Sequence, residues 1–221
     1  MLTLWLLALG TSAQPAPAQS EVSPPVNTNR PAVLVLGDSL AAGYGVDPNE
    51  AYPALLQKKM DEAGLNFTVV NGGVSGDTSA GGLRRINWYL RRNTAVLILE
   101  LGGNDGLRGV APATIRTNLQ AIIDTARKAY PNIKLVVAGM RMPPNLGADY
   151  TAAFEKVFPE LAQTNHAALV PFLLEGVGGR PDLNQADQIH PTPEGHKIVA
   201  ENVWKVLQPV LKAIADGASS H

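Results

Sequence analysis

Cysteine is absent from this 221-residue chain, so disulfide bridges, thiolate metal sites and a cysteine nucleophile are all excluded. Charge is scarce and balanced, because charged residues make up 17% of the chain and the formal net charge is −1. This balance gives no electrostatic attraction to nucleic acid or to an anionic membrane. Walker-type and Gly-x-Gly-x-x-Gly phosphate-binding patterns are also missing. We therefore expect no nucleic-acid partner, no cofactor and no metal.

The apolar stretch at residues 2–9 is too short to span a bilayer. Small residues follow it, and both Ala13 and the triplet Ala16-Pro17-Ala18 suit a cleavage site. No Lys or Arg precedes the apolar stretch, which is a departure from the usual export signal. We predict a signal peptide at residues 1–18 and a disordered leader at residues 19–30. The processed protein would then be periplasmic or secreted, with no transmembrane anchor.

Buried strands and amphipathic helices alternate from residue 31 onward. Short apolar runs predict strands at residues 32–36, 67–70, 95–101, 133–138 and 167–170. Apolar residues spaced three and four apart predict helices between and after them, the last at about residues 193–214. Five such units predict an α/β fold, a three-layer α/β/α sandwich around a five-stranded parallel sheet. We expect one domain at residues 31–214 and a short tail at residues 215–221.

A serine follows the first predicted strand, in the segment Gly37-Asp38-Ser39-Leu40. In open α/β sheets, ligands bind at the carboxyl ends of the strands. A serine hydroxyl becomes a nucleophile when a base accepts its proton and an oxyanion site lies beside it. Ser39 is therefore the candidate nucleophile.

Asp187 and His190 are three residues apart, so on one helical turn or in a tight loop their side chains can form a hydrogen bond. A carboxylate in that position holds the imidazole in the tautomer that can accept the serine proton. Other histidines are weaker candidates: His166 precedes a strand, and we expect His196 on a helix surface. His190 is therefore the candidate base.

Three donors suit an oxyanion hole: the Ser39 backbone N–H, a glycine N–H after the second strand, and the Asn104 side-chain amide. By spacing alone, Gly76 cannot be chosen over Gly72 or Gly73. Asn104 alone could equally be a turn residue.

Loops after the strands are expected to line the substrate cleft, and their apolar side chains suit an acyl or aryl group. The cleft candidates are Asp38, Leu107, Arg108 and Met142. Asp38 and Asp105 each follow a glycine behind a strand, and we assign both to loop hydrogen bonds rather than to catalysis. The basic cluster of Arg84, Arg85, Arg91 and Arg92 is interpreted as the solvated face of a helix.

Four blocks together resemble the SGNH hydrolases, also called the GDSL esterase/lipase family: Gly37-Asp38-Ser39-Leu40, Gly76, Gly102-Gly103-Asn104-Asp105 and Asp187-Gln188-Ile189-His190. Flanking segments such as Gly76-Asp77-Thr78-Ser79 are similar to the bacterial branch with thioesterase I/lysophospholipase L1 and arylesterases. The resemblance implies a flavodoxin-like sheet, a Ser39–His190–Asp187 triad, and an oxyanion hole of Ser39, Gly76 and Asn104.

The expected activity is that of a serine esterase on short to medium acyl or aryl esters, with acyl thioesters and lysophospholipids as further substrates. A carbohydrate O-deacetylase would use the same triad, although the low aromatic content of 5% counts against its aromatic-lined cleft. A non-catalytic binding module is the remaining alternative.

Overall fold

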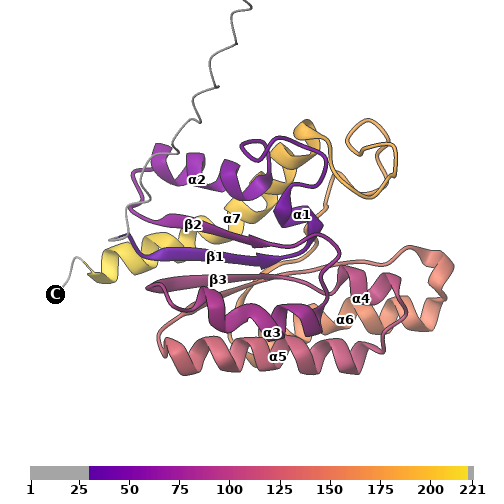
Figure 1. The fold of residues 1–221 in the computed structure, drawn as a ribbon, viewed down its shortest axis with the longest axis horizontal. Coiled ribbons are helices and arrows are strands. Elements are labelled where there is room, and N and C mark those ends of the chain that lie inside the picture. The colour runs from indigo at the N-terminus through magenta and orange to yellow at the C-terminus, as the bar shows by residue number, and fades with distance from the viewer. Residues whose placement is uncertain (1–29, 219–221) are drawn as a thin grey trace, which may run out of the picture.

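The computed structural model describes residues 30–218, which contain a five-stranded parallel sheet with strand order β2-β1-β3-β4-β5 (Figure 1). Its strands are β1 (Ala32–Gly37), β2 (Thr68–Gly73), β3 (Thr94–Glu100), β4 (Lys134–Ala138) and β5 (Ala168–Val170). The predicted α/β fold with five parallel strands is thus confirmed. The predicted signal peptide and all but the last residue of the leader lie outside the described residues.

Helices cover both faces of the sheet. Figure 1 shows α2 (Tyr52–Glu62) and α7 (Pro193–Ala218) on one face and α3 (Ser79–Tyr89), α5 (Pro112–Ala129) and α6 (Ala148–Thr164) on the other. Three short elements complete the set: α1 (Ser39–Ala42), α4 (Gly103–Leu107) and the 3-10 helix η1 (Pro144–Leu146). Between residues 30 and 218, no helix combines the length and the apolar character that crossing a membrane requires.

The two central strands explain why the sheet is parallel and buried. All six residues of β1 are buried, as are the last five residues of β3. Side chains that are apolar on both faces of a strand need helices on both sides of the sheet to exclude water. The chain passes from β1 outward to β2 and then crosses back to β3 on the other side of β1. The carboxyl ends of β1 and β3 therefore form a topological switch point, where such folds bind ligands.

Two element ends differ from the sequence prediction. Strand β2 continues to Gly73 because Asn71, Gly72 and Gly73 pair with the last three residues of β1. Helix α7 continues to Ala218, so the first part of the predicted tail at residues 215–221 is helical. Both extensions depend on neighbouring elements rather than on local sequence.

Candidate active site

Ser39 is the first residue of α1, directly after β1 (Figure 1). Asp38 caps this short helix, because its Oδ1 accepts a hydrogen bond of 3.0 Å from the backbone N–H of Leu40. Gly37 has no room for a side chain, since an added Cβ would lie 2.2 Å from the Glu100 Oε2 atom. The buried end of β1 thus turns sharply and presents the serine hydroxyl at the carboxyl edge of the sheet.

The candidate base and its carboxylate lie in a tight loop before α7, rather than on a helical turn. Gln188 has a φ of 60°, which bends the backbone so that Asp187 Oδ1 accepts hydrogen bonds from the backbone N–H groups of Ile189 and His190. Gln185 Nε2 donates to the Tyr44 carbonyl oxygen at 2.7 Å, which ties this loop to the segment after α1.

Ser39, His190 and Asp187 form a continuous chain of hydrogen bonds. His190 Nδ1 lies 2.7 Å from Asp187 Oδ2, and His190 Nε2 lies 2.9 Å from Ser39 Oγ. The backbone and side-chain hydrogen bonds from His190 lower the pKa of Asp187 to about 2, so this carboxylate is ionised and only accepts. The proton of a neutral His190 must therefore reside on Nδ1, which leaves Nε2 free to accept from the serine hydroxyl.

All three candidate oxyanion donors lie on segments that meet at this edge of the sheet. Gly76 has a φ of 77° in a turn closed by a 3.0 Å hydrogen bond from Asp77 N–H to the Val74 carbonyl oxygen. Asn104 Nδ2 donates one N–H to Asp38 Oδ2 at 3.1 Å, which fixes the Asn104 side chain. The second N–H of this amide remains available for an oxyanion. Within residues 30–218, the backbone N–H groups of Ser39 and Gly76 donate to no other group.

The four cleft candidates lie in different environments. Asp38 is 3% exposed and uses its carboxylate within the protein, so it is poorly placed to contact a substrate. Leu107 is 48% exposed on α4, and Met142 is half-buried, with its sulfur against Gly106. Arg108 is exposed, and its Nη2 donates to the Gly76 carbonyl oxygen at 3.1 Å.

Exposed apolar side chains are concentrated on the loops around Ser39. Five large apolar side chains of the described residues are exposed, and four of them follow the carboxyl ends of strands or flank His190: Tyr44, Val74, Leu107 and Ile189. The Tyr44 ring lies 4.6 Å from the His190 ring, measured between centroids. Tyr44 was not among the site residues expected from the sequence, where it lies five residues after the serine.

Two buried carboxyl groups lie beneath the candidate nucleophile. Glu100 is completely buried at the end of β3, and its Oε2 accepts a hydrogen bond from Asp38 N–H at 3.3 Å. Burial and the neighbouring Asp38 charge raise the pKa of Glu100 well above its usual value, and burial raises the pKa of Asp38. Asp38 and Asp105 make the loop hydrogen bonds that were expected of them. Nothing in the sequence distinguished Glu100.

Two sequence expectations are wrong. His196 is 1% exposed rather than on a helix surface, because α7 packs on α2 and the His196 ring accepts a hydrogen bond from Tyr52 N–H. Burial lowers the pKa of His196 to about 4. The arginine cluster is only partly a solvated face, because Arg85 turns inward to Asp77 and to strand-end carbonyls.

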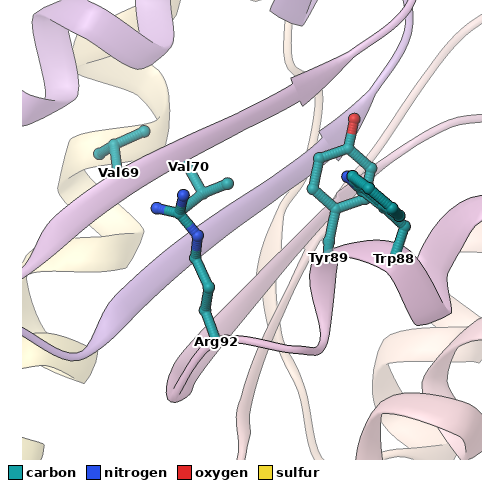
Figure 2. A pocket seen from close by; sticks show the side chains of 5 residues that line it. All are labelled: Val69, Val70, Trp88, Tyr89 and Arg92. Carbon is teal, nitrogen blue, oxygen red and sulfur yellow. The ribbon is translucent and has the colours of Figure 1, made fainter. Parts of the chain in front are cut away.

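A separate pocket lies away from Ser39, along the edge strand β2 and the end of α3. Figure 2 shows its lining side chains, which are Val69, Val70, Trp88, Tyr89 and Arg92. The pocket holds no carboxylate, histidine or serine, so it lacks the groups of a serine–histidine–carboxylate triad. The candidate triad lies instead beyond the carboxyl end of β1.

Comparison with known proteins identifies the family. Residues 35–198 match the model of the GDSL-like lipase/acylhydrolase family, so the chain belongs to that family. Esterase TesA of Pseudomonas aeruginosa is 45% identical over 180 residues, which are 81% of this chain and 89% of that protein. An arylesterase of Vibrio mimicus is 41% identical over 79% of this chain and 87% of its own. Thioesterase 1/protease 1/lysophospholipase L1 of Escherichia coli K12 is 38% identical over 81% and 84%.

Solved structures agree with this assignment. The crystal structure of TesA has a TM-score of 0.77 and 45% identity, and the match covers 80% of this chain and 98% of that one. A family 3 carbohydrate esterase of Clostridium thermocellum has a TM-score of 0.69 at 22% identity, over 84% and 99% of the two chains, and shares the fold alone. The chain is thus a hydrolase of the SGNH type, as its four sequence blocks predicted, and the deacetylase alternative is not favoured.

Proposed function

We propose that this protein hydrolyses carboxylic esters through an acyl-enzyme intermediate on Ser39. The observation that carries the proposal is the chain of hydrogen bonds from Asp187 through His190 to the Ser39 hydroxyl. A serine hydroxyl is a weak nucleophile unless a neighbouring base takes its proton during attack. We assign this role to His190, which with its proton on Nδ1 can accept the serine proton at Nε2.

In the first half-reaction, Ser39 Oγ attacks the ester carbonyl carbon while its proton passes to His190 Nε2. Negative charge develops on the carbonyl oxygen, and the N–H groups of Ser39, Gly76 and Asn104 are assigned to stabilise it. The bond to the leaving alcohol then breaks, and His190 gives that alcohol the proton. In the second half-reaction His190 takes a proton from water, whose oxygen attacks the acyl carbon. The bond from that carbon to Ser39 Oγ then breaks, His190 returns the proton to Oγ, and the acid is released.

The exposed apolar side chains around Ser39 favour an acyl or aryl substituent without charge. Short to medium acyl esters and aryl esters are the proposed substrates, and acyl thioesters and lysophospholipids are further ones. Relatives named esterase, arylesterase and thioesterase 1/lysophospholipase L1 support this range. Substrates of this kind are small molecules.

Hydrolysis of p-nitrophenyl esters from two to sixteen acyl carbons, beside phenyl acetate and palmitoyl-CoA, tests the proposal. The Ser39→Ala variant is the matched control, because it removes one oxygen atom and leaves the hydrogen bond between Asp187 and His190 intact. We expect turnover in the parent and none above background in the variant. Activity that survives in a folded Ser39→Ala protein would reject the nucleophile assignment.

Export to the periplasm or the medium is part of the proposal. It is supported by the apolar stretch at residues 2–9 and by the small residues that follow, with processing near residue 18 and a leader that ends at residue 30. The hydrolase domain itself is assigned to residues 31–214. Expression of the full chain followed by cell fractionation and N-terminal sequencing tests this assignment. A full-length protein found only in the cytoplasm would contradict it.

A further inference from the structure

The turn that carries Gly76 is fixed to the strand that carries Ser39 at one shared atom. The Gly37 carbonyl oxygen, two residues before Ser39, accepts a 3.1 Å hydrogen bond from Val74 N–H at the start of the turn. The same oxygen accepts a 2.8 Å hydrogen bond from Arg85 Nη2. Arg85 also reaches Asp77, at the other end of the turn, through a 2.6 Å contact between Nε and Oδ2.

Arg85 uses its guanidinium group to join three backbone segments. Besides Gly37 and Asp77, its Nη1 donates to the carbonyl oxygen of Gly72 near the end of β2. The guanidinium lies 5.5 Å from the centre of the Tyr89 ring, one helical turn further along α3. Its side chain is 19% exposed and that of Asp77 is 12% exposed, so water competes weakly for this ion pair. A planar group with donors in a fixed fork suits such a junction, whereas a lysine could replace only part of it.

Asp77 is itself held on the side that faces α3. Its Oδ1 accepts a 2.9 Å hydrogen bond from Thr78 N–H, and a Cβ added to Gly81 would lie 1.6 Å from that same oxygen. The carboxylate therefore lies against a helix position that leaves space only for glycine. The Gly76 N–H is thus directed by a turn whose two ends are both attached to the strand of the nucleophile.

We propose that Arg85 is a positioning residue that holds the Gly76 N–H at the distance from Ser39 at which it stabilises the oxyanion. This inference rests on the proposed esterase function and adds a residue that does not touch the substrate. Arg85 acts through Asp77 and the Gly37 carbonyl. A donor displaced by about 1 Å loses much of its effect on a transition state, although it still allows the substrate to bind.

The test compares Arg85→Met and Arg85→Lys with Arg84→Met, a matched change at the exposed neighbouring arginine. Turnover of p-nitrophenyl butyrate is measured per reactive serine, counted by the p-nitrophenolate released from diethyl p-nitrophenyl phosphate. For Arg85→Met we expect kcat per site to fall roughly tenfold to hundredfold while KM stays within about threefold. Arg85→Lys should be intermediate, and Arg84→Met should match the parent.

Inhibition by phenylboronic acid, which forms a tetrahedral adduct with a serine, gives a second measurement. Its inhibition constant should weaken in parallel with kcat in the Arg85 variants, because both depend on the oxyanion hole. A purely structural Arg85 would instead lower the melting temperature and the number of reactive serines, with kcat per site unchanged. That result would overturn the inference.

Two further variants keep the test informative if Arg85→Met does not fold. Asp77→Asn removes the charge that Arg85 contacts, and Gly81→Ala displaces the Asp77 carboxylate without touching Arg85. Both variants should lower kcat per reactive serine while KM stays nearly constant. In the double variant Asp77→Asn/Arg85→Lys, the fold-decrease in kcat should be smaller than the product of the two single fold-decreases. Full additivity would overturn the inference. The Ser39→Ala control separates these results from a failure of the proposed function itself.

Discussion

The candidate site has a sheet half around Ser39 and a loop half around His190 and Asp187, and the two are built in different ways. Ser39 follows a fully buried strand, and the surrounding segments are held by buried groups such as Glu100 and Asp38. His190 and Asp187 lie instead in a loop where Asp187 is exposed and where backbone hydrogen bonds provide most of the order. The candidate nucleophile and the candidate oxyanion donors thus lie on segments that follow the strands, whereas the candidate base is positioned by one short loop and its own carboxylate.

Removing the carboxylate from the loop half should have the largest effect. In Asp187→Asn the amide can donate to His190 Nδ1, so the imidazole is held in the tautomer that cannot accept the Ser39 proton. We expect kcat to fall on the order of 10³–10⁴-fold with the fold retained. Steady-state kinetics and a circular dichroism spectrum check this. Near-normal turnover would make Asp187 a structural residue.

Removing an oxyanion donor from the sheet half should have the next largest effect. In Asn104→Ala the side-chain N–H is lost, which should raise the barrier by about 2.7–4 kcal/mol and lower kcat by several hundred-fold. The measurement is kcat and KM with a p-nitrophenyl ester in the folded variant. Asn118→Ala is a suitable control, because Asn118 Nδ2 donates to the Ser79 hydroxyl and not to Asp38. An unchanged kcat in Asn104→Ala would remove Asn104 from the role.

The free energy of unfolding should also respond to acid, through the buried His196 of α7. His196 has a folded pKa of about 4 against an ordinary value of 6.5, so the unfolded chain binds a proton that the folded chain does not between these values. The stability from neutral His196 is complete above pH 6.5 and is lost as the pH falls toward 4, by about 3 kcal/mol in all. Glu100 and Asp38 have raised pKa values and act in the opposite direction. Urea unfolding at pH 7 and pH 4 should therefore show a smaller loss in His196→Gln than in the parent. Equal losses would contradict the prediction.

Releasing the loop half from the rest of the domain should have the smallest effect. Gln185→Ala removes the hydrogen bonds of Nε2 to the carbonyl oxygens of Pro191, within the loop, and Tyr44, and only the second ties the His190 loop to the segment after α1. A net hydrogen-bond contribution of about 0.5–1.5 kcal/mol translates into a loss of kcat of roughly twofold to tenfold. Gln163→Ala, at an exposed position of α6, is the control. If Gln185→Ala lowered kcat more than Asn104→Ala does, the order of effects expected for the two halves would be wrong.

The sequence predicted the parts of the molecule that local pattern determines. Apolar runs identified every strand of the sheet. They are clearest in β1, β3 and β4, because strands buried on both faces have no polar alternation, whereas β2 and β5 are mostly partly buried. The residues Ser39, His190 and Asp187 were found by their place after strands and by their spacing, and the structure brings them within hydrogen-bond distance. Gly76 was chosen over Gly72 and Gly73 only by family resemblance. The turn that distinguishes it is closed by a hydrogen bond between backbone atoms, which does not depend on residue type.

The features that the sequence did not predict depend on which elements meet in space. Arg85 and Arg84 look alike in a helical sequence, and only the position of β2 beside α3 makes one of them point inward. His196 was expected at the surface of a helix, but α2 covers that side of α7. Glu100 ends an apolar strand, and its burial follows from the absence of a side chain on Gly37.

Both ends of the described domain lie at the edge of the sheet opposite to Ser39. Arg30 pairs with Asp61 near the start of β1, and the last turns of α7 line a hollow with the starting residues of β3 and β4. An attachment made at either end of the described residues, whether to a bead, an electrode or a fused protein, would therefore leave the candidate active site facing away from the support. Immobilised in this way, the domain would keep Ser39 open to the solution.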